Sequence, residues 1–138
     1  AVDAWVIWDP FFAAAEHQIG ARILATGQNL VSNHQFYLAD RKFAEQNPEI
    51  LKTLVNELNT TTQWVSQHQD EAAKLLEKPT GLSSDILKTS ISRMGFGVQA
   101  ISAEVTQEQQ YVADAFYQQK LIPNKINIQA AILNQASK

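Results

Sequence analysis

The 138-residue chain contains no cysteine, which excludes a disulfide framework and any chemistry that depends on a thiolate. Glycine is scarce, and Gly95-Phe96-Gly97 is a helix stop rather than a phosphate-binding loop. Eleven basic residues against 14 acidic ones leave a net charge of −3 with no basic block, which argues against a nucleic-acid partner. No apolar run approaches the roughly 20 residues that a membrane-spanning helix needs.

Catalytic and metal-binding patterns are also missing. The three histidines, His17, His34 and His68, are scattered and none has the spacing of a metal site. No nucleophile elbow occurs. Asp3 and Asp9 bracket a predicted strand and would lie near its opposite ends, so they make a poor acid/base pair. The sequence therefore predicts a protein without metal or cofactor that is not an enzyme.

What is present favours a globular domain with a sizeable core, since 45% of the residues are hydrophobic and 18% are charged. Helical patterns dominate after residue 40. Asn47-Pro48-Glu49 is a clear helix start, and the helix should run to about His68. Its apolar residues share one face that we expect to be buried: Ile50, Leu51, Leu54, Val55 and Leu58. Further helices are predicted at 41–46, from Asp70, from Ser83 or Ser84, and from Ser102 to about Lys120.

The opening stretch, residues 3–12, is the part around which the chain is organised. Residues 3–8 are rich in β-branched and aromatic side chains, which predicts a buried strand. Pro10 suits the first turn of a helix over 10–19, with Asp9 as its N-cap and Gly20 at its end. Residues 22–25 and 35–39 are further strand candidates. The predicted fold class is α/β, mostly helical with about three short strands.

Candidate ligand-binding residues follow from this strand-to-helix corner. Ligands of α/β folds sit at the carboxyl ends of strands, next to helix N-termini, which places Trp8 and Asp9 at a ligand edge. The alternative is that both tryptophans, Trp5 and Trp8, are core residues. Trp5 is the weaker candidate, because regular alternation puts residues 5 and 8 on opposite faces of a strand.

A polar connector supplies three more candidates, Ser32, Asn33 and His34. Their side chains could donate hydrogen bonds to an anionic head group. The alternative is a connector that is simply solvated.

Several motifs carry a family resemblance. Residues 2–11 (VDAWVIWDPF), 21–25 (ARILA) and 36–39 (FYLA) resemble the second half of an aliphatic-sulfonate-binding protein. Such proteins are periplasmic substrate-binding subunits of ABC importers, in the nitrate/sulfonate/taurine group. The resemblance covers nearly the whole chain and implies the C-terminal portion of a type II periplasmic-binding-protein fold. It assigns residues 1–33 to the end of the second lobe and 34–138 to the returning part of the first.

The resemblance also implies a function. The solute would be a small anion, an alkanesulfonate, with taurine and nitrate as alternatives, and the ABC permease subunits would be protein partners. The tryptophan that corresponds to Trp8 lies at the cleft in taurine- and sulfonate-binding proteins. A carboxylate facing a sulfonate is repulsive, so Asp9 has a capping role as its alternative. The expected location is the periplasm or cell surface, with a signal peptide upstream of this fragment.

The resemblance further implies an incomplete chain. Residue 1 leads directly into a predicted buried strand, which would leave sheet edges unpaired. We therefore expect a missing N-terminal part, or another copy of the chain, as a partner.

Two other functions share the predicted fold. A thiamine-pyrimidine synthase would be an enzyme with a bound cofactor and a nearby histidine, for which only His34 is placed. A ligand-sensing domain of a regulator would need a DNA-binding or signalling module elsewhere. The sequence leaves open which sulfonate or oxyanion binds.

Overall fold

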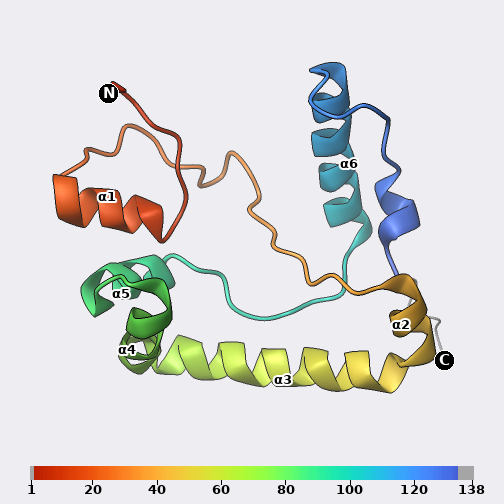
Figure 1. Ribbon diagram of the computed structural model, residues 1–138, viewed down its shortest axis with the longest axis horizontal. Helices are drawn as coiled ribbons and strands as arrows, with labels where there is room; N and C mark the ends of the chain where they lie inside the picture. Colours follow the sequence, from red (N-terminus) through yellow and green to blue (C-terminus); the bar gives the residue numbers. More distant parts are fainter. Residues whose placement is uncertain (1, 134–138) are drawn as a thin grey trace. The chain divides into compact units, whose positions relative to one another are not determined.

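The computed structural model describes residues 2–133, and within this range it contains helices and no strand. The α-helices and one 3-10 helix are, in order, α1 (Phe11–Ile19), α2 (Arg41–Gln46), α3 (Pro48–Gln67), α4 (Gln69–Thr80), α5 (Ser84–Ser92), α6 (Ala103–Gln118) and η1 (Ile128–Ala131) (Figure 1). The chain forms two compact units. The first unit combines the residues up to Ser32 with Leu54–Val98, and the second combines Asn33–Thr53 with the residues from Gln99 on.

The boundaries of these units do not coincide with those of the predicted lobes, because the first unit takes segments from both sides of residue 33. The helix α3 contributes its beginning to the second unit and its remainder to the first. The assignment of residues 1–33 and 34–138 to two lobes of a binding protein stays a prediction.

The core of the first unit lies where α5 packs on α4 and on α1. Small side chains let these helices approach closely: Ala72 and Ala73 of α4 are buried together with Leu87 and Ile91 of α5. A second buried cluster joins α1 to α5 through Ala13, Ala14 and Ile86. Partly buried residues surround the first cluster: Trp64, Val65, Leu82 and Phe96. Trp64 is thus closer to a core residue than to a site residue.

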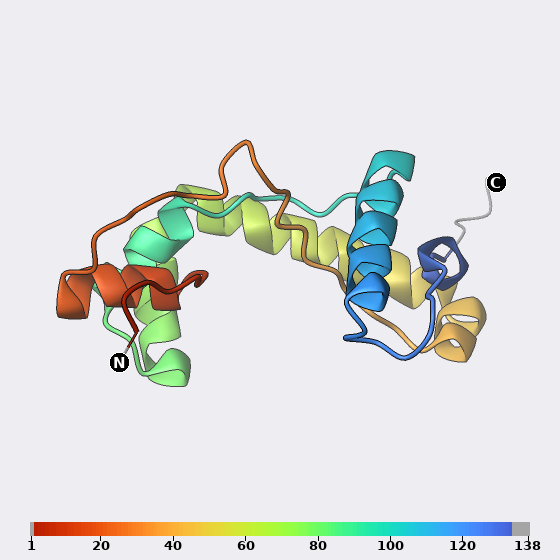
Figure 2. The same ribbon diagram turned by 90° about the horizontal axis from the view of Figure 1, so that it is seen from above.

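In the second unit α6 lies beside η1 (Figure 2). The side-chain amide of Gln110 on α6 binds the segment that leads into η1. Its nitrogen donates to the carbonyl of Ile126 at 2.8 Å, and its oxygen accepts from the N–H of Ile128 at 3.0 Å. Arg41 of α2 donates to the carbonyl of Ala130. These polar contacts to backbone groups fix α6, η1 and α2 within the unit.

Residues next to the helix ends cap several of the helices. The Asp40 side chain accepts from the N–H of Phe43 at the start of α2, and the Ser102 hydroxyl accepts from the N–H of Val105 at the start of α6. Gly20 follows α1 with a φ of 63°, which a residue without a Cβ adopts most easily. Pro79 lies in the last turn of α4, which ends at Thr80.

The three predicted strands are wrong for the residues that the structure describes. Residues 3–8, 22–25 and 35–39 belong to no ladder. Val6, predicted at the centre of a buried strand, is 96% exposed. A strand exists only where a neighbour accepts and donates its backbone hydrogen bonds, and β-propensity alone does not supply that neighbour.

The predicted burial of the apolar face of α3 is also wrong. The helix buries none of its residues, and Leu54 is 47% exposed. The 3.6-residue period of the apolar positions predicted the helix correctly. It could not show whether another element covers the face.

Candidate functional site

The corner between the opening segment and α1 is built by backbone and side-chain hydrogen bonds. The carbonyl of Trp8 accepts from the N–H of Phe12 at 3.0 Å. The Asp9 carboxylate accepts from the N–H of Ala13 at 3.0 Å, across a cis Asp9–Pro10 peptide bond. Pro10 itself holds the N-cap position, with φ −84° and ψ −3°. Asp9 thus caps α1 as expected, from one residue further out.

Both tryptophans of the opening segment are exposed. The Trp8 residue is 69% exposed and Trp5 is almost equally so. Their interpretation as core residues is therefore wrong for the described structure. An exposed indole on a segment anchored to a helix start is free to contact another molecule or another part of a larger fold.

Arg93, directly after α5, contacts three residues at this corner. Its guanidinium lies 2.6 Å from a carboxylate oxygen of Glu16 and 3.5 Å from Oδ1 of Asp9. It also sits over the ring of Phe12, 4.3 Å from the centroid, in a cation–π contact. We call Arg93, Asp9, Glu16 and Phe12 the Arg93 cluster.

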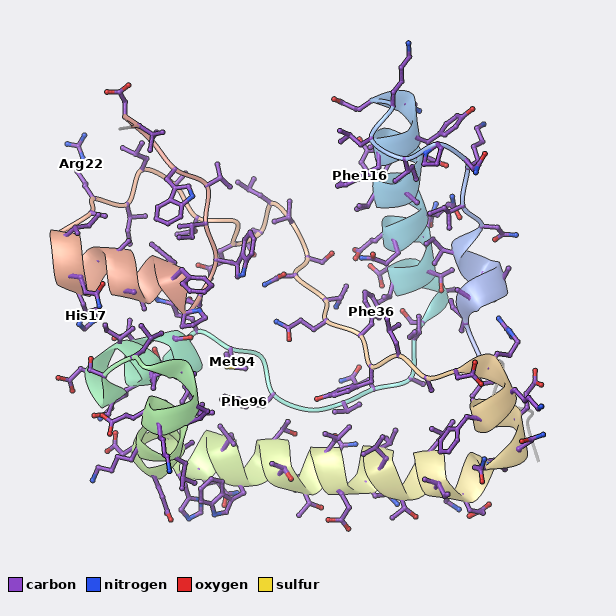
Figure 3. All side chains as sticks on the ribbon, viewed as in Figure 1. His17, Arg22, Phe36, Met94, Phe96 and Phe116 are labelled. Carbon is purple, nitrogen blue, oxygen red and sulfur yellow. The ribbon has the colours of Figure 1, made fainter. Side chains whose placement is uncertain are left out.

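No sequence signal pointed to Arg93. It is separated from Glu16 by 77 positions, and a single arginine at a helix end has no spacing that would mark it. The cluster joins α1 to α5, alongside a hydrogen bond between His17 and Thr89 at 3.0 Å. Figure 3 shows His17 on the side of α1 that faces α5.

Asp9 is already committed within the chain. Oδ1 accepts the Ala13 N–H and faces the Arg93 guanidinium, and the side chain is only 20% exposed. A carboxylate that accepts a helix N–H and lies beside a cation has a structural role at the start of the helix. The geometry supports the capping alternative for Asp9.

The connector residues divide between the two units: Ser32 belongs to the first, and Asn33 and His34 belong to the second. All three are exposed. His34 Nε2 lies 3.3 Å from a carboxylate oxygen of Glu108 on α6, and its ring is 6.4 Å from that of Phe36, which Figure 3 labels. The structure thus groups Trp5, Trp8 and Asp9 on one segment and His34 with Glu108 elsewhere. Their union in one site stays a prediction.

A surface hollow at the junction of α3 and α4 is lined by Ser66, Gln67, His68, Gln69, Asp70, Glu71 and Lys88. It includes none of the predicted ligand residues. Asp70 pairs with Lys88 at 2.5 Å, and this hydrogen bond and charge raise the pKa of Lys88 above its usual 10.5. His68 is stacked on Trp64 with ring centroids 4.9 Å apart. Asp70, Lys88 and His68 are thus each in contact with another side chain of the same unit.

Residues 2–133 contain no group of three or more potential metal-ligating side chains. Over the same residues, no helix combines the length and the apolar character needed to cross a membrane.

No family model matches the chain. Two curated proteins are similar to it over nearly its whole length. A protein of Escherichia coli (strain K12) described as "Putative aliphatic sulfonates-binding protein" is 33% identical over 132 residues, which is 95% of this chain and 41% of that protein. A protein of Bacillus subtilis (strain 168) with the same description is 28% identical over 135 residues, or 97% of this chain and 41% of that protein.

Two solved structures match the fold. The periplasmic aliphatic sulphonate binding protein SsuA from Escherichia coli has a TM-score of 0.86 and 34% identity, over 96% of this chain and 44% of that one. The alkanesulfonate-binding protein SsuA from Xanthomonas axonopodis pv. citri, bound to MOPS, has a TM-score of 0.84 and 30% identity, over 96% and 46%.

These matches confirm the resemblance to aliphatic-sulfonate-binding proteins and show that the chain folds like part of them. The chain spans about two fifths of the length of the curated relatives that it matches.

Proposed function

We propose that this chain is part of the extracytoplasmic solute-binding component of an ABC importer for alkanesulfonates or a related small oxyanion. The observation that carries the proposal is the match of 96% of the chain, at 30% and 34% identity, to two SsuA structures. Both curated relatives are described as sulfonate-binding proteins, which supports a binding role rather than an enzymatic one.

The proposed ligand contact is Trp8. Its exposed indole offers an apolar wall for the alkyl part of a sulfonate, and its backbone is anchored at the start of α1. Ser32, Asn33 and His34, with nearby backbone amides, are the proposed donors to the charged head group. The mechanism is closure of two lobes around the solute, with hydrogen bonds and apolar packing as its chemistry.

The location and the partners are parts of the same proposal. A solute-binding component works outside the cytoplasm, in the periplasm or at the cell surface, and delivers its solute to permease subunits. Because the chain spans about two fifths of its curated relatives, the binding component also needs the remaining part of that fold. That part would supply the second wall against which the solute is held.

A thiamine-pyrimidine synthase-like enzyme is the second candidate, and the pairing of His34 with Glu108 is the observation that favours it. A carboxylate that orients an imidazole is a common arrangement in acid/base catalysis. The pair is 41% exposed and belongs to the second unit. The importer function therefore has the stronger support.

Isothermal titration calorimetry of the complete natural polypeptide tests the proposal. The panel contains several alkanesulfonates, taurine, nitrate and a pyrimidine. We expect saturable binding of at least one sulfonate. Binding of the pyrimidine alone would replace the importer with the enzyme, and binding of none of these compounds would remove both.

A further inference from the structure

Asp9 poses an electrostatic problem for the proposed function. It is adjacent in sequence to Trp8, the proposed contact of an anionic solute. A carboxylate within a few ångströms of a sulfonate opposes binding, and the opposition is strongest where water is excluded. An anion site at Trp8 needs a positive charge that offsets Asp9.

The Arg93 cluster contains that charge. The Arg93 guanidinium lies 3.5 Å from Oδ1 of Asp9, and Arg93 itself is the residue that follows the C-terminal end of α5. The Arg93 side chain is 32% exposed, so its positive charge can act on an ion that approaches from solvent. Glu16, at 2.6 Å, competes for the same guanidinium. Removing Arg93 would leave the carboxylates of Asp9 and Glu16 without the cation that contacts both of them.

We propose that Arg93 determines the anion specificity of the Trp8 corner by neutralising Asp9, so that a sulfonate can approach the exposed indole. The inference rests on the proposed function and adds the residue that makes that site compatible with a negative charge. Arg93 acts through Asp9 and is therefore a positioning and electrostatic residue rather than a direct ligand.

Two substitutions separate this electrostatic role from a purely structural one. Arg93→Gln and Glu16→Gln both break the same 2.6 Å ion pair, but they change the local charge in opposite directions. If the pair only stabilises the packing of α1 on α5, both variants weaken sulfonate binding. If the charge matters, Arg93→Gln weakens binding and Glu16→Gln strengthens it.

The experiment is calorimetric titration of the complete natural polypeptide with ethanesulfonate, at low and high ionic strength. We expect Arg93→Gln to raise the Kd by about threefold to tenfold and Glu16→Gln to lower it by about twofold. Both effects should shrink in high salt. Asp9→Asn in the Arg93→Gln background should restore affinity, because the amide keeps the capping oxygen without the charge. Arg93→Lys should retain most of the affinity.

The controls distinguish a failure of the role proposed for Arg93 from a failure of the proposed function. Lys74→Gln removes one positive charge from α4, outside the cluster, and should leave the Kd unchanged. Thermal melts followed by circular dichroism check that each variant is folded. Equal weakening by Arg93→Gln and Glu16→Gln, or no change in either, overturns the role of Arg93 while the wild-type affinity still supports the importer. Failure of the wild-type protein to bind any sulfonate removes the proposed function, and this inference falls with it.

Discussion

At Trp8, exposure separates ligand binding from folding. The Trp8 residue is 69% exposed, so its ring packs little against the core. Trp8→Ala should therefore leave the melting temperature almost unchanged. In the complete polypeptide the same change should weaken sulfonate binding by on the order of 2 kcal/mol, the size of a buried aromatic contact. Calorimetric titration with an alkanesulfonate measures the affinity. Unchanged affinity would show that the site lies elsewhere.

Asp9, unlike Trp8, is expected to contribute to the stability of the fold. Its carboxylate caps α1 through the Ala13 N–H, so Asp9→Ala should lower the free energy of unfolding by about 1 kcal/mol. Asp9→Asn keeps a capping oxygen and is the matched control, with a smaller loss. Urea denaturation followed by circular dichroism gives both values. Equal stability of the alanine variant and the wild type would mean that the cap contributes nothing.

At the scale of helices, the contribution of an apolar residue to stability depends on whether another element covers its side chain. Leu87 of α5 is 3% exposed and lies in the cluster with Ala72, Ala73 and Ile91. Leu54 of α3 has the same side chain and is 47% exposed. The two residues therefore form a matched pair for measuring burial.

Leu87→Ala should destabilise the chain by roughly 2–5 kcal/mol, because it leaves a cavity in a packed cluster. Leu54→Ala should cost about 1 kcal/mol or less, since half of its surface is already in water. Both values come from denaturant unfolding of the 138-residue chain. A loss at Leu54 as large as that at Leu87 would show that another molecule covers α3 in solution.

At the scale of the whole molecule, two segments outside the helices leave apolar side chains exposed and form no ladder. Residues 3–8 and 35–39 carry exposed apolar side chains, including Val6 and Leu38, on backbone that forms no ladder. Unpaired extended backbone with apolar side chains is a template for pairing with another strand. We therefore predict that these segments pair with a strand of another molecule, either a further part of the binding-protein fold or a second copy of the chain.

The isolated 138-residue chain should therefore self-associate. Size-exclusion chromatography with light scattering should show a mass that rises with protein concentration. A Val6→Lys and Leu38→Lys double variant should shift the population toward monomer, because charged side chains on an exposed strand oppose edge pairing. Lys substitution of Gln109, on α6, is the control for added charge. A monodisperse monomer with a cooperative melt would contradict the expectation.

The sequence alone determined the features that depend on a few neighbouring residues. Asp40 and Ser102 mark the starts of α2 and α6, Pro48 the start of α3 and Gly20 the end of α1, because capping and turn chemistry act within one helical turn. The motifs of the opening stretch also led to the correct family resemblance.

Tertiary structure decided what depends on residues far apart in the chain. The pairing of Arg93 with Asp9 and Glu16 and that of His34 with Glu108 join separate elements that no spacing rule connects. The exposure of Val6 and Leu54 likewise depends on which elements cover them. Propensity and periodicity describe a residue's own segment, whereas burial, ion pairing and sheet formation require a second segment to be brought against it.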